Sequence, residues 1–294
     1  MKFLCILLIT SQFCLAQTIF IKDKLTKEEV PYAIVKLDSL GFYTDVNGSL
    51  DISNQKFEHI WVTHLNYEDH KINAKNLSDT LWLEPKDDYL DEVIIRDFSM
   101  KKQKRLKAPS KYFSVVLFKN SETISCLCPK KDFENVFITK FKFDIDKRQN
   151  LIEKDKLEKI SISIRLNLYN IENWKPAQIK NSILFEKLSI NDMLENKHQL
   201  ILEFENQAIA LNEQGFCFGI EVLGYFEGDK KIDVNSLIIN TSKNKSKYFD
   251  SKLYLRYPIN DNKLVRFDEF HKRDFEIFNF KHIPVLIPEI ILYE

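Results

Sequence analysis

The sequence predicts an all-β protein with two domains, an N-terminal β-sandwich of about seven strands and a larger antiparallel β-sandwich of jelly-roll type. Phe and Tyr are frequent, with 23 and 11 residues, whereas Gly and Ala are scarce. Scarce Ala argues against a mainly helical chain, and aromatic residues favour strands. A length of 294 residues suits one large or two ordinary domains, each with its own core.

The first sixteen residues have the pattern of a secretory signal peptide. An apolar run covers residues 3–10 after Lys2, and Cys14 and Ala16 stand at −3 and −1 of a cut after Ala16. A bulky residue before Cys14 disfavours a lipid anchor there. No later stretch reaches 18 apolar residues, so we expect no transmembrane segment after cleavage. We therefore expect residues 1–16 to be removed and the rest to be exported, to the periplasm, the outer membrane or the extracellular space.

Residues 17–96 are expected to form the first sandwich. Seven short stretches rich in Val, Ile, Thr and aromatic residues are separated by polar turns. These candidate strands are residues 18–22, 32–38, 41–44, 49–52, 59–65, 80–83 and 92–95. The alternation of Ala33, Val35 and Leu37 indicates a sheet with one face inward. Trp61 and Trp82 lie inside strands with apolar neighbours, so we expect both in the core.

The polar segment between two of these strands is assigned to a structural turn rather than a metal site. Asn47 and Gly48 suit the positive φ of a tight hairpin. The Asp45 side chain can accept a hydrogen bond from the backbone N–H two residues later in the chain. A calcium loop of the EF-hand type needs Gly at its sixth position and Glu at its twelfth. In a loop that begins at Asp45, Gly48 stands at the fourth position, and no Glu stands at the twelfth.

Five motifs in this region occur in the order found in a known family. They are Pro31-Tyr32-Ala33, Thr44-Asp45-Val46-Asn47-Gly48, Leu65-Asn66-Tyr67, Leu83-Glu84-Pro85 and Leu90-Asp91-Glu92-Val93-Ile94-Ile95. Residues 18–96 thereby resemble the carboxypeptidase-regulatory-like domain of exported Gram-negative envelope proteins, which also precedes the plug of many TonB-dependent receptors. The sequence departs from the family in lacking the usual Gly of the first strand and in carrying Asn66 where Gly is usual.

The resemblance implies a seven-stranded transthyretin-like β-sandwich that acts as a folding and interaction module. It does not imply peptidase activity, because no His is followed three residues later by the Glu of a zinc-binding His-x-x-Glu motif. A TonB-dependent receptor is also excluded, because the chain after residue 96 is too short for the closed barrel of such a receptor.

Residues 97–111 are predicted to be a basic linker between the domains. Lys101, Lys102, Lys104 and Arg105 make a short charge run. Such a run is usually a solvated connector. Docking onto anionic headgroups or polysaccharide is the alternative, and it makes these four residues candidate binding residues.

Residues 112–294 are predicted to form the second β-sandwich. Alternating segments at 135–145, 159–171, 198–206 and 215–226 indicate strands, and two segments are expected to be polar loops, residues 173–187 and 229–250. In the second strand, apolar residues at alternate positions are expected to share one face. These are Ile160, Ile162, Ile164, Leu166 and Leu168.

Three cysteines remain after the predicted cleavage, Cys126, Cys128 and Cys217. The odd number leaves at least one thiol free or paired outside the chain. Buried thiols are the favoured interpretation, and a disulfide from Cys217 to either of the others is left open. A metal site built on two thiolates lacks nearby ligands to complete it.

The sequence contains no motif for a nucleophile or a phosphate-binding loop, so we expect no catalytic residue, no cofactor and no enzyme activity. Clustered carboxylates such as Asp87 and Asp88 are interpreted as turn residues rather than calcium ligands. No metal is expected at His59 and His64, which a continuous strand would send to opposite faces. Lys and Arg balance Asp and Glu at 43 each, which argues against nucleic-acid binding.

The expected function is that of a non-catalytic exported envelope protein that acts as a protein-interaction or accessory module. The alternative is carbohydrate binding by loops of the second sandwich, where Trp174 and Lys175 are candidate contacts for a sugar ring. A loop anchor that folds back onto the core is the other interpretation of Trp174. The expected partner is an envelope protein or a surface glycan.

Overall fold

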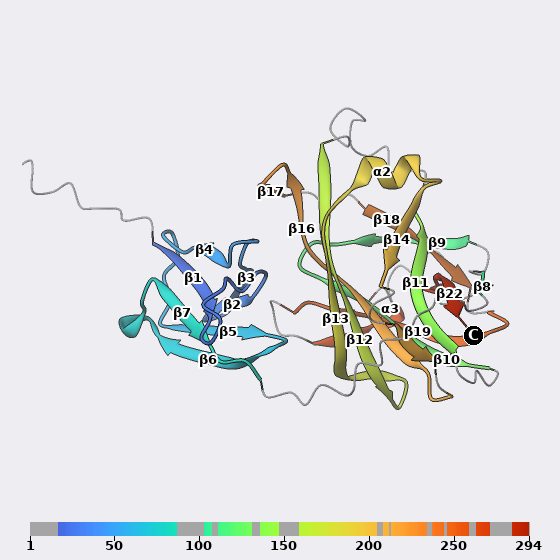
Figure 1. Cartoon of the computed structure of the whole chain (residues 1–294), viewed down its shortest axis with the longest axis horizontal. Helices are drawn as coiled ribbons and strands as arrows, with labels where there is room; N and C mark the ends of the chain where they lie inside the picture. The colour runs from blue at the N-terminus through green and yellow to red at the C-terminus, as the bar shows by residue number, and fades with distance from the viewer. Residues whose placement is uncertain are drawn as a thin grey trace, which may run out of the picture. The chain divides into compact units, whose positions relative to one another are not determined.

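The computed structural model is built almost entirely of β-strands (Figure 1), which confirms the predicted all-β class. It describes residues 17–86, 103–107, 111–130, 136–146, 159–204, 208–211, 213–233, 237–243, 246–258, 263–270 and 284–293. The chain divides into two compact units, the N-terminal unit (Met1–Tyr89) and the C-terminal unit (Leu90–Glu294). The predicted signal peptide and the predicted strand at 92–95 lie outside the described residues.

The N-terminal unit consists of two small sheets that share one core. The first has the order β4-β1-β7 and contains β1 (Thr18–Asp23), β4 (Ser49–Asp51) and β7 (Thr80–Leu83). The second has the order β3-β2-β5-β6 and contains β2 (Ile34–Leu37), β3 (Leu40–Tyr43), β5 (His59–His64) and β6 (Tyr67–Asn73). Strands β1 and β7 are parallel, and the other pairs are antiparallel. Six of these strands fall where the sequence predicts them, and β6 is additional.

The predicted core positions of the two tryptophans are wrong. Trp61 is 45% exposed and Trp82 is 40% exposed. Side chains alternate along a strand, so only every second residue reaches the core. Smaller neighbours fill those places, namely Ile60 and Val62 in β5 and Leu81 and Leu83 in β7, all of them buried. Both indoles therefore point outward.

The turn at Asp45–Gly48 joins the two sheets instead of closing a hairpin. Strand β3 before it belongs to one sheet and β4 after it to the other. The Asp45 carboxylate accepts backbone N–H bonds from Asn47 at 2.9 Å and from Ser49 at 2.7 Å. Gly48 has a φ of 68°, and a Cβ there would lie 2.6 Å from the Ile21 carbonyl oxygen. Glycine is therefore required both by the backbone conformation and by the close approach of β1.

A partly buried hydrogen bond connects the two sheets at the other end of β1. The Asp23 carboxylate accepts the Thr26 N–H at 2.9 Å, the Leu25 N–H at 2.6 Å and the Tyr67 hydroxyl at 2.9 Å. The bond from Thr26, helped by those from Tyr67 and Leu25, holds the pKa of Asp23 below its usual range. Burial and the bond to Asp23 raise the pKa of Tyr67 to about 12.

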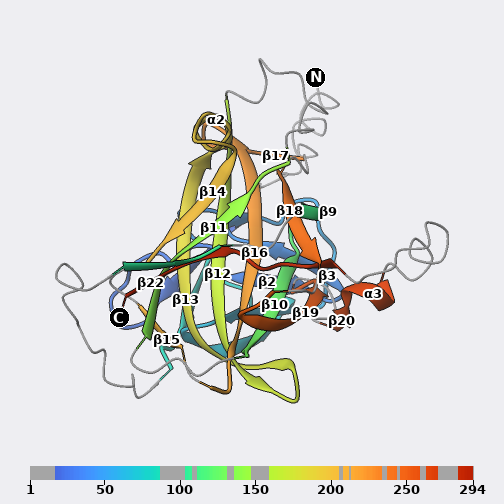
Figure 2. The same ribbon diagram turned by 90° about the vertical axis from the view of Figure 1, so that its right-hand side faces the viewer.

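The described residues of the C-terminal unit form three sheets. Figure 2 shows their strands. The largest is here called the large sheet, and its strands have the order β13-β12-β16-β10-β19-β20, with β17 beside β16. These strands are β10 (Glu122–Pro129), β12 (Ile160–Glu172), β13 (Lys175–Ser189), β16 (Phe216–Glu227), β17 (Lys230–Ile232), β19 (Phe249–Arg256) and β20 (Leu264–Arg266). The second has the order β14-β11-β22-β8 with β15 beside β11, and contains β8 (Gln103–Leu106), β11 (Val136–Asp144), β14 (Gln199–Glu203), β15 (Ile209–Leu211) and β22 (Glu289–Tyr293).

The third sheet has the order β21-β18-β9 and contains β9 (Lys111–Leu117), β18 (Leu237–Lys243) and β21 (Pro284–Val285). Two short helices, α2 (Ile190–Glu195) and α3 (Phe267–Phe270), complete the unit among the described residues. The strand pairs in the described part of this unit are all antiparallel.

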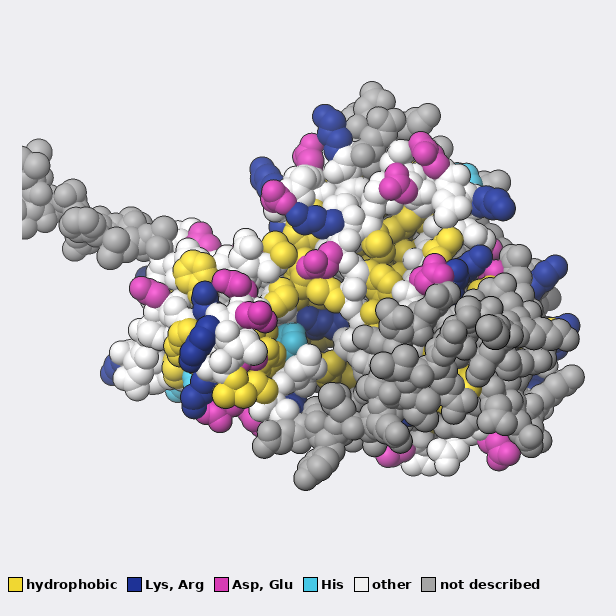
Figure 3. Space-filling model, in the orientation of Figure 1, with side chains coloured by type: hydrophobic (Ala, Val, Ile, Leu, Met, Phe, Trp, Pro, Cys, Tyr) yellow, Lys and Arg dark blue, Asp and Glu magenta, His cyan; other side chains and the backbone are white. Residues whose placement is uncertain are grey.

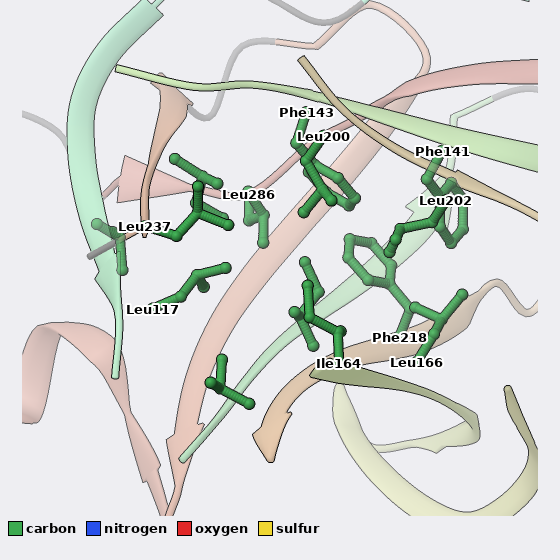
Figure 4. Close-up of a cluster of buried hydrophobic side chains, with 14 of the residues drawn as sticks. Leu117, Phe141, Phe143, Ile164, Leu166, Leu200, Leu202, Phe218, Leu237 and Leu286 are labelled. Atoms are coloured by element: carbon green, nitrogen blue, oxygen red, sulfur yellow. The ribbon is translucent and has the colours of Figure 1, made fainter. Parts of the chain in front are cut away.

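One face of the large sheet packs against the other two sheets to form the core. The predicted common face of β12 is confirmed, because the five apolar residues from Ile160 to Leu168 all enter this core. Figure 4 shows β12 and β16 side chains beside those of β11 and β14, with Ile164, Leu166 and Phe218 near Phe141, Phe143, Leu200 and Leu202. The ring of Phe141 lies 4.9 Å from that of Phe218.

Several segments predicted as connections are strands instead. Most of the polar loop predicted at residues 173–187 belongs instead to β13 (Lys175–Ser189), which is an edge strand of the large sheet. An edge strand tolerates polar residues because part of it faces water, so its composition is similar to that of a loop. Strands β17 and β18 lie within the other predicted loop, 229–250. Part of the predicted linker 97–111 forms β8, which pairs with β22.

Replacing Tyr67 by Phe removes the hydroxyl that Asp23 accepts. At pH 8 we expect the free energy of unfolding of the N-terminal unit to fall by about 1.5–3 kcal/mol, as for hydrogen bonds to charged groups. In the wild type, Tyr67 keeps its proton up to about pH 12 when folded, but loses it near pH 10 when unfolded. The wild type therefore loses stability as the pH rises above 10, and the difference between the two proteins narrows.

Urea unfolding at pH 8 and pH 11 measures this difference. Replacing Trp174 by Phe in both proteins leaves Trp61 and Trp82 as the fluorescent reporters of the N-terminal unit. A difference that stays constant or widens at pH 11 would contradict the Tyr67–Asp23 hydrogen bond.

Candidate functional site

Trp174 and Lys175, the candidate sugar contacts, lie together at the turn between β12 and β13. Trp174 is partly buried, and its carbonyl oxygen accepts the hydroxyl of Tyr254. The ammonium of Lys252 lies 5.0 Å from the centre of the indole. Lys175 is exposed and faces Glu172 in the strand register. Trp174 is therefore bound to β19 and is less exposed than a free stacking platform would be.

The four candidate residues of the basic run are not brought together in the described structure. Lys101 and Lys102 lie outside the described residues. Lys104 and Arg105 belong to β8, where their backbones face Leu292 and Ile291 of β22. This part of the run is a sheet strand rather than a connector.

The largest exposed side chains of the N-terminal unit's sheets are its two tryptophans. Trp61 lies in β5 between Lys36 of β2 and Lys71 of β6, which face it in the register. Trp82 lies in β7, opposite Lys22 of β1. Each indole is therefore flanked by lysines on the outer face of its sheet. Figure 3 shows hydrophobic side chains at the surface of this unit beside Lys side chains.

A groove of about 400 Å³ lies beside Trp82, between β6 and β7. Its charged and polar lining includes Glu68, Asp69 and His70 from β6 and Lys24 and Glu84 near the ends of β1 and β7. Lys24 and Glu84 form an ion pair, and the hydrogen bond and charge of Lys24 hold the pKa of Glu84 below its usual range.

A second group of polar residues lies on the large sheet, on the face opposite the hydrophobic core. We call it the charged cluster. It consists of Glu122 from β10, Arg165, Asn167 and Tyr169 from β12, Glu221 from β16 and Arg256 from β19. All six side chains are buried or nearly so. Charged groups out of water must be paired, so their partners determine what the cluster can do.

Glu122 is the centre of the charged cluster and is 0% exposed. One carboxylate oxygen accepts the Asn167 amide at 3.0 Å and the Tyr169 hydroxyl at 2.5 Å. The other accepts two N–H groups of Arg256, from Nε at 2.9 Å and from Nη2. Burial and the neighbouring Glu122 raise the pKa of Tyr169, so this hydroxyl keeps its proton and donates it. Gly219 leaves the space for Glu122, since a Cβ there would lie 1.9 Å from the carboxylate.

Glu221 faces Glu122 directly in the register of β10 and β16. Like charges opposite each other repel. The Asn167 amide bridges them, since it also donates to Glu221 at 2.9 Å, and Arg165 lies 3.5 Å from the same oxygen. The Ser182 hydroxyl of β13 donates to the side-chain amide oxygen Oδ1 of Asn167 at 2.9 Å. The two carboxylates are thus balanced by two guanidinium groups, and five strands contribute to the network.

Cys126 and Cys217 form a disulfide on the same strand pair. They face each other in the register four residues from the Glu122–Glu221 pair, and therefore on the same face of the sheet. This settles the question that the sequence leaves open. Cys128 is a free, partly exposed thiol, and burial together with the charge of Asp250 raises its pKa.

Sequence reasoning did not identify the charged cluster, although β12 carries a signal for it. Arg165, Asn167 and Tyr169 alternate there with core residues. In one strand alone this alternation indicates a face in water. Only the strand order β12-β16-β10-β19, which places the polar residues of four strands on one face, turns that face into a buried network.

Within the described ranges, no group of three or more His, Cys, Asp or Glu side chains is placed to hold a metal ion. The part of the chain that the structure describes also has no helix that is long and apolar enough to cross a membrane. No protein-family model matches the chain, and no curated protein or solved structure matches it either.

Replacing Arg256 by Met leaves Glu122 buried without its counter-charge. We expect the free energy of unfolding of the C-terminal unit to fall by about 3–5 kcal/mol, as when one partner of a buried pair is removed. Arg266 on the neighbouring strand β20 is the matched control. It is 42% exposed and lies 4.0 Å from Glu269, so Arg266→Met should cost less than about 1 kcal/mol.

Urea unfolding followed by the fluorescence of Trp174, with Trp61 and Trp82 replaced by Phe, measures both variants. Equal losses for Arg256→Met and Arg266→Met would show that the charged cluster does not stabilise the large sheet.

Proposed function

We propose that the chain is a non-catalytic interaction module of an exported envelope protein, and that its N-terminal unit contacts the partner. The observation that carries this proposal is the exposure of Trp61 and Trp82, each flanked by lysines. Tryptophan in the centre of an interface is among the residues that contribute most to affinity. The lysines would provide a polar rim around each indole.

The chemistry of the charged cluster supports a non-catalytic role. Both oxygens of the Glu122 carboxylate are engaged by side chains of the protein, and the side chain is buried. An acid or base that acts on a substrate must reach the proton that it transfers. We therefore assign the charged cluster to holding strands together.

The disulfide supports export. Disulfides persist in oxidising compartments and are rare in the reducing cytosol. The Cys126–Cys217 bond joins strands 91 residues apart in the sequence. It agrees with the signal-peptide pattern of residues 1–16, from which we propose an envelope or extracellular location.

The two-sheet arrangement of the N-terminal unit supports the proposed relation to the carboxypeptidase-regulatory-like domain. Two of the matching motifs have a structural role in it. The Asp45–Gly48 turn joins the sheets, and Tyr67 bonds to Asp23 across them. Under this proposal the unit acts as an accessory domain that positions the chain on an envelope partner.

Affinity capture from detergent-solubilised envelope tests the proposal, with residues 17–294 as bait and mass spectrometry of the bound proteins. We expect one stoichiometric membrane protein. Replacing Trp61 or Trp82 by Ala should weaken its binding about 30-fold or more, which corresponds to the loss of about 2 kcal/mol at an interface hot spot. Trp174→Phe, in the C-terminal unit, is the control and should bind as the wild type does.

Two results would contradict the interaction proposal. One is capture that survives both tryptophan substitutions. The other is capture of no protein, with binding instead to purified surface polysaccharide that Trp174→Ala weakens, which would assign the function to carbohydrate binding by the C-terminal unit.

A further inference from the structure

We infer that the N-terminal unit binds an extended, basic peptide strand in the groove between β6 and β7. This inference rests on the proposed interaction function and names the class of partner and the place where it binds. The partner would add a strand to an open sheet edge, with main-chain bonds giving affinity and side chains giving selectivity.

Strands β6 and β7 are joined at one end of the groove and separate along it. At the joined end, the Glu68 N–H donates to the Glu84 carbonyl at 2.8 Å, and the Lys86 N–H donates to the Asn66 carbonyl at 2.9 Å. Among the described residues, no backbone hydrogen bond joins β6 and β7 beyond Glu68. The groove of about 400 Å³ begins there.

The backbone of β7 presents hydrogen-bonding groups to this groove. Bonds from Phe20 N–H to the Asp79 carbonyl and from Lys24 N–H to the Leu83 carbonyl turn the odd-numbered residues of β7 toward β1. Backbone direction alternates along a strand, so Thr80 and Trp82 face the groove. The Thr80 carbonyl accepts the Ser78 hydroxyl at 2.6 Å. The N–H and C=O of Trp82 have no backbone partner in the described part of the chain.

Strand β6 presents a matching set on the opposite wall. The Ala74 N–H donates to the Glu58 carbonyl, and Ile72 faces Ile60 in the same register. The even-numbered residues from His70 to Ala74 therefore bond to β5, and Lys71 between them directs its N–H and C=O away from β5, at the open edge of β6. Strands β6 and β7 thus each have an open backbone edge, which is what an added strand requires.

The charge of the lining selects a basic strand. Glu68, Asp69 and Glu84 oppose Lys24 of the lining and Lys27, whose ammonium lies 4.6 Å from the centre of the Trp82 ring, so with His70 neutral the formal charge is 2 − 3 = −1. Lys or Arg at alternate positions of the partner strand would therefore meet these carboxylates.

The long edge strand β13 is less suited to this role. Its register with β12 shifts at three places, between Ile162 and Ile164, between Leu168 and Tyr169 and between Tyr169 and Ile171. Such bulges blunt an edge against pairing with other chains. Strand β7 has an unbroken register with β1.

The test uses a synthetic seven-residue peptide of alternating Thr and Lys with blocked ends, a second peptide with Glu in place of Lys, and the oxidised chain 17–294. Residue-resolved amide hydrogen exchange and titration calorimetry report on both peptides. We expect the Lys peptide to slow exchange of the Trp82 amide about tenfold or more, and the Glu peptide to bind about tenfold more weakly or not at all. Equal binding of both peptides, or protection only outside the groove, would overturn the inference.

Variants of the lining provide the second measurement. Glu68→Gln combined with Asp69→Asn should weaken binding of the Lys peptide about tenfold, because two of the three carboxylates lose their charge. Glu58→Gln is the control. It is an exposed carboxylate of the same unit outside the groove lining and should change the affinity less than about twofold. An equal effect of the two changes would overturn the assignment of the groove.

The peptide experiment separates this inference from the proposed function. If the envelope partner is captured through Trp61 and Trp82 but the Lys peptide does not bind in the groove, the strand site is wrong and the interaction function stands. If the peptide binds as expected while no envelope protein is captured, the strand site stands and the proposed function is wrong.

Discussion

A fully buried carboxylate must be neutralised where it lies, and Glu122 imposes this requirement on the large sheet. Its counter-charge comes from Arg256 on β19, and its other donors come from Asn167 and Tyr169 on β12. Gly219 on β16 leaves the space that the carboxylate occupies. A slip of one residue in any of these strands would turn its side chains to the opposite face of the sheet. The charged cluster therefore specifies the register of four neighbouring strands at once.

The disulfide fixes the same register covalently. Cys126 and Cys217 oppose each other on the two central strands, just as Glu122 and Glu221 do. A buried ion pair alone is weak support for stability, because the cost of removing charges from water offsets much of their attraction. The covalent bond keeps two like charges opposite each other, while Asn167 and the two arginines balance them. We attribute the fixed register of these strands to the disulfide and the charged cluster together.

The sequence is a good guide to strands and a poor guide to what their outward faces meet. The alternation in β12 correctly predicts which of its residues enter the core, because a period of two leaves no other choice. The outward positions of Trp61 and Trp82 follow from the same period, but their apolar neighbours in the strands suggested burial. Strand β13 has the composition of a loop because it lies at an edge. The charged cluster depends on the order β12-β16-β10-β19, which no local pattern contains.

The two units differ in how their sheet edges and faces are used. In the C-terminal unit, polar groups on the large sheet are bonded to one another. In the N-terminal unit, Trp82 presents its backbone groups and side chain at an open groove. The proposed accessory role uses this difference, with the partner bound at the open groove of the N-terminal unit.

Residue-resolved amide hydrogen exchange of the oxidised chain, without any partner, tests the central role of the charged cluster most directly. If the cluster joins four strands, the amides of Ile124, Leu166 and Ile220 should exchange slowest and with one common free energy of opening, and those of edge strand β20 should exchange faster. If β10, β12 and β16 exchanged independently, each with its own free energy of opening, the result would contradict the role of the charged cluster in joining these strands.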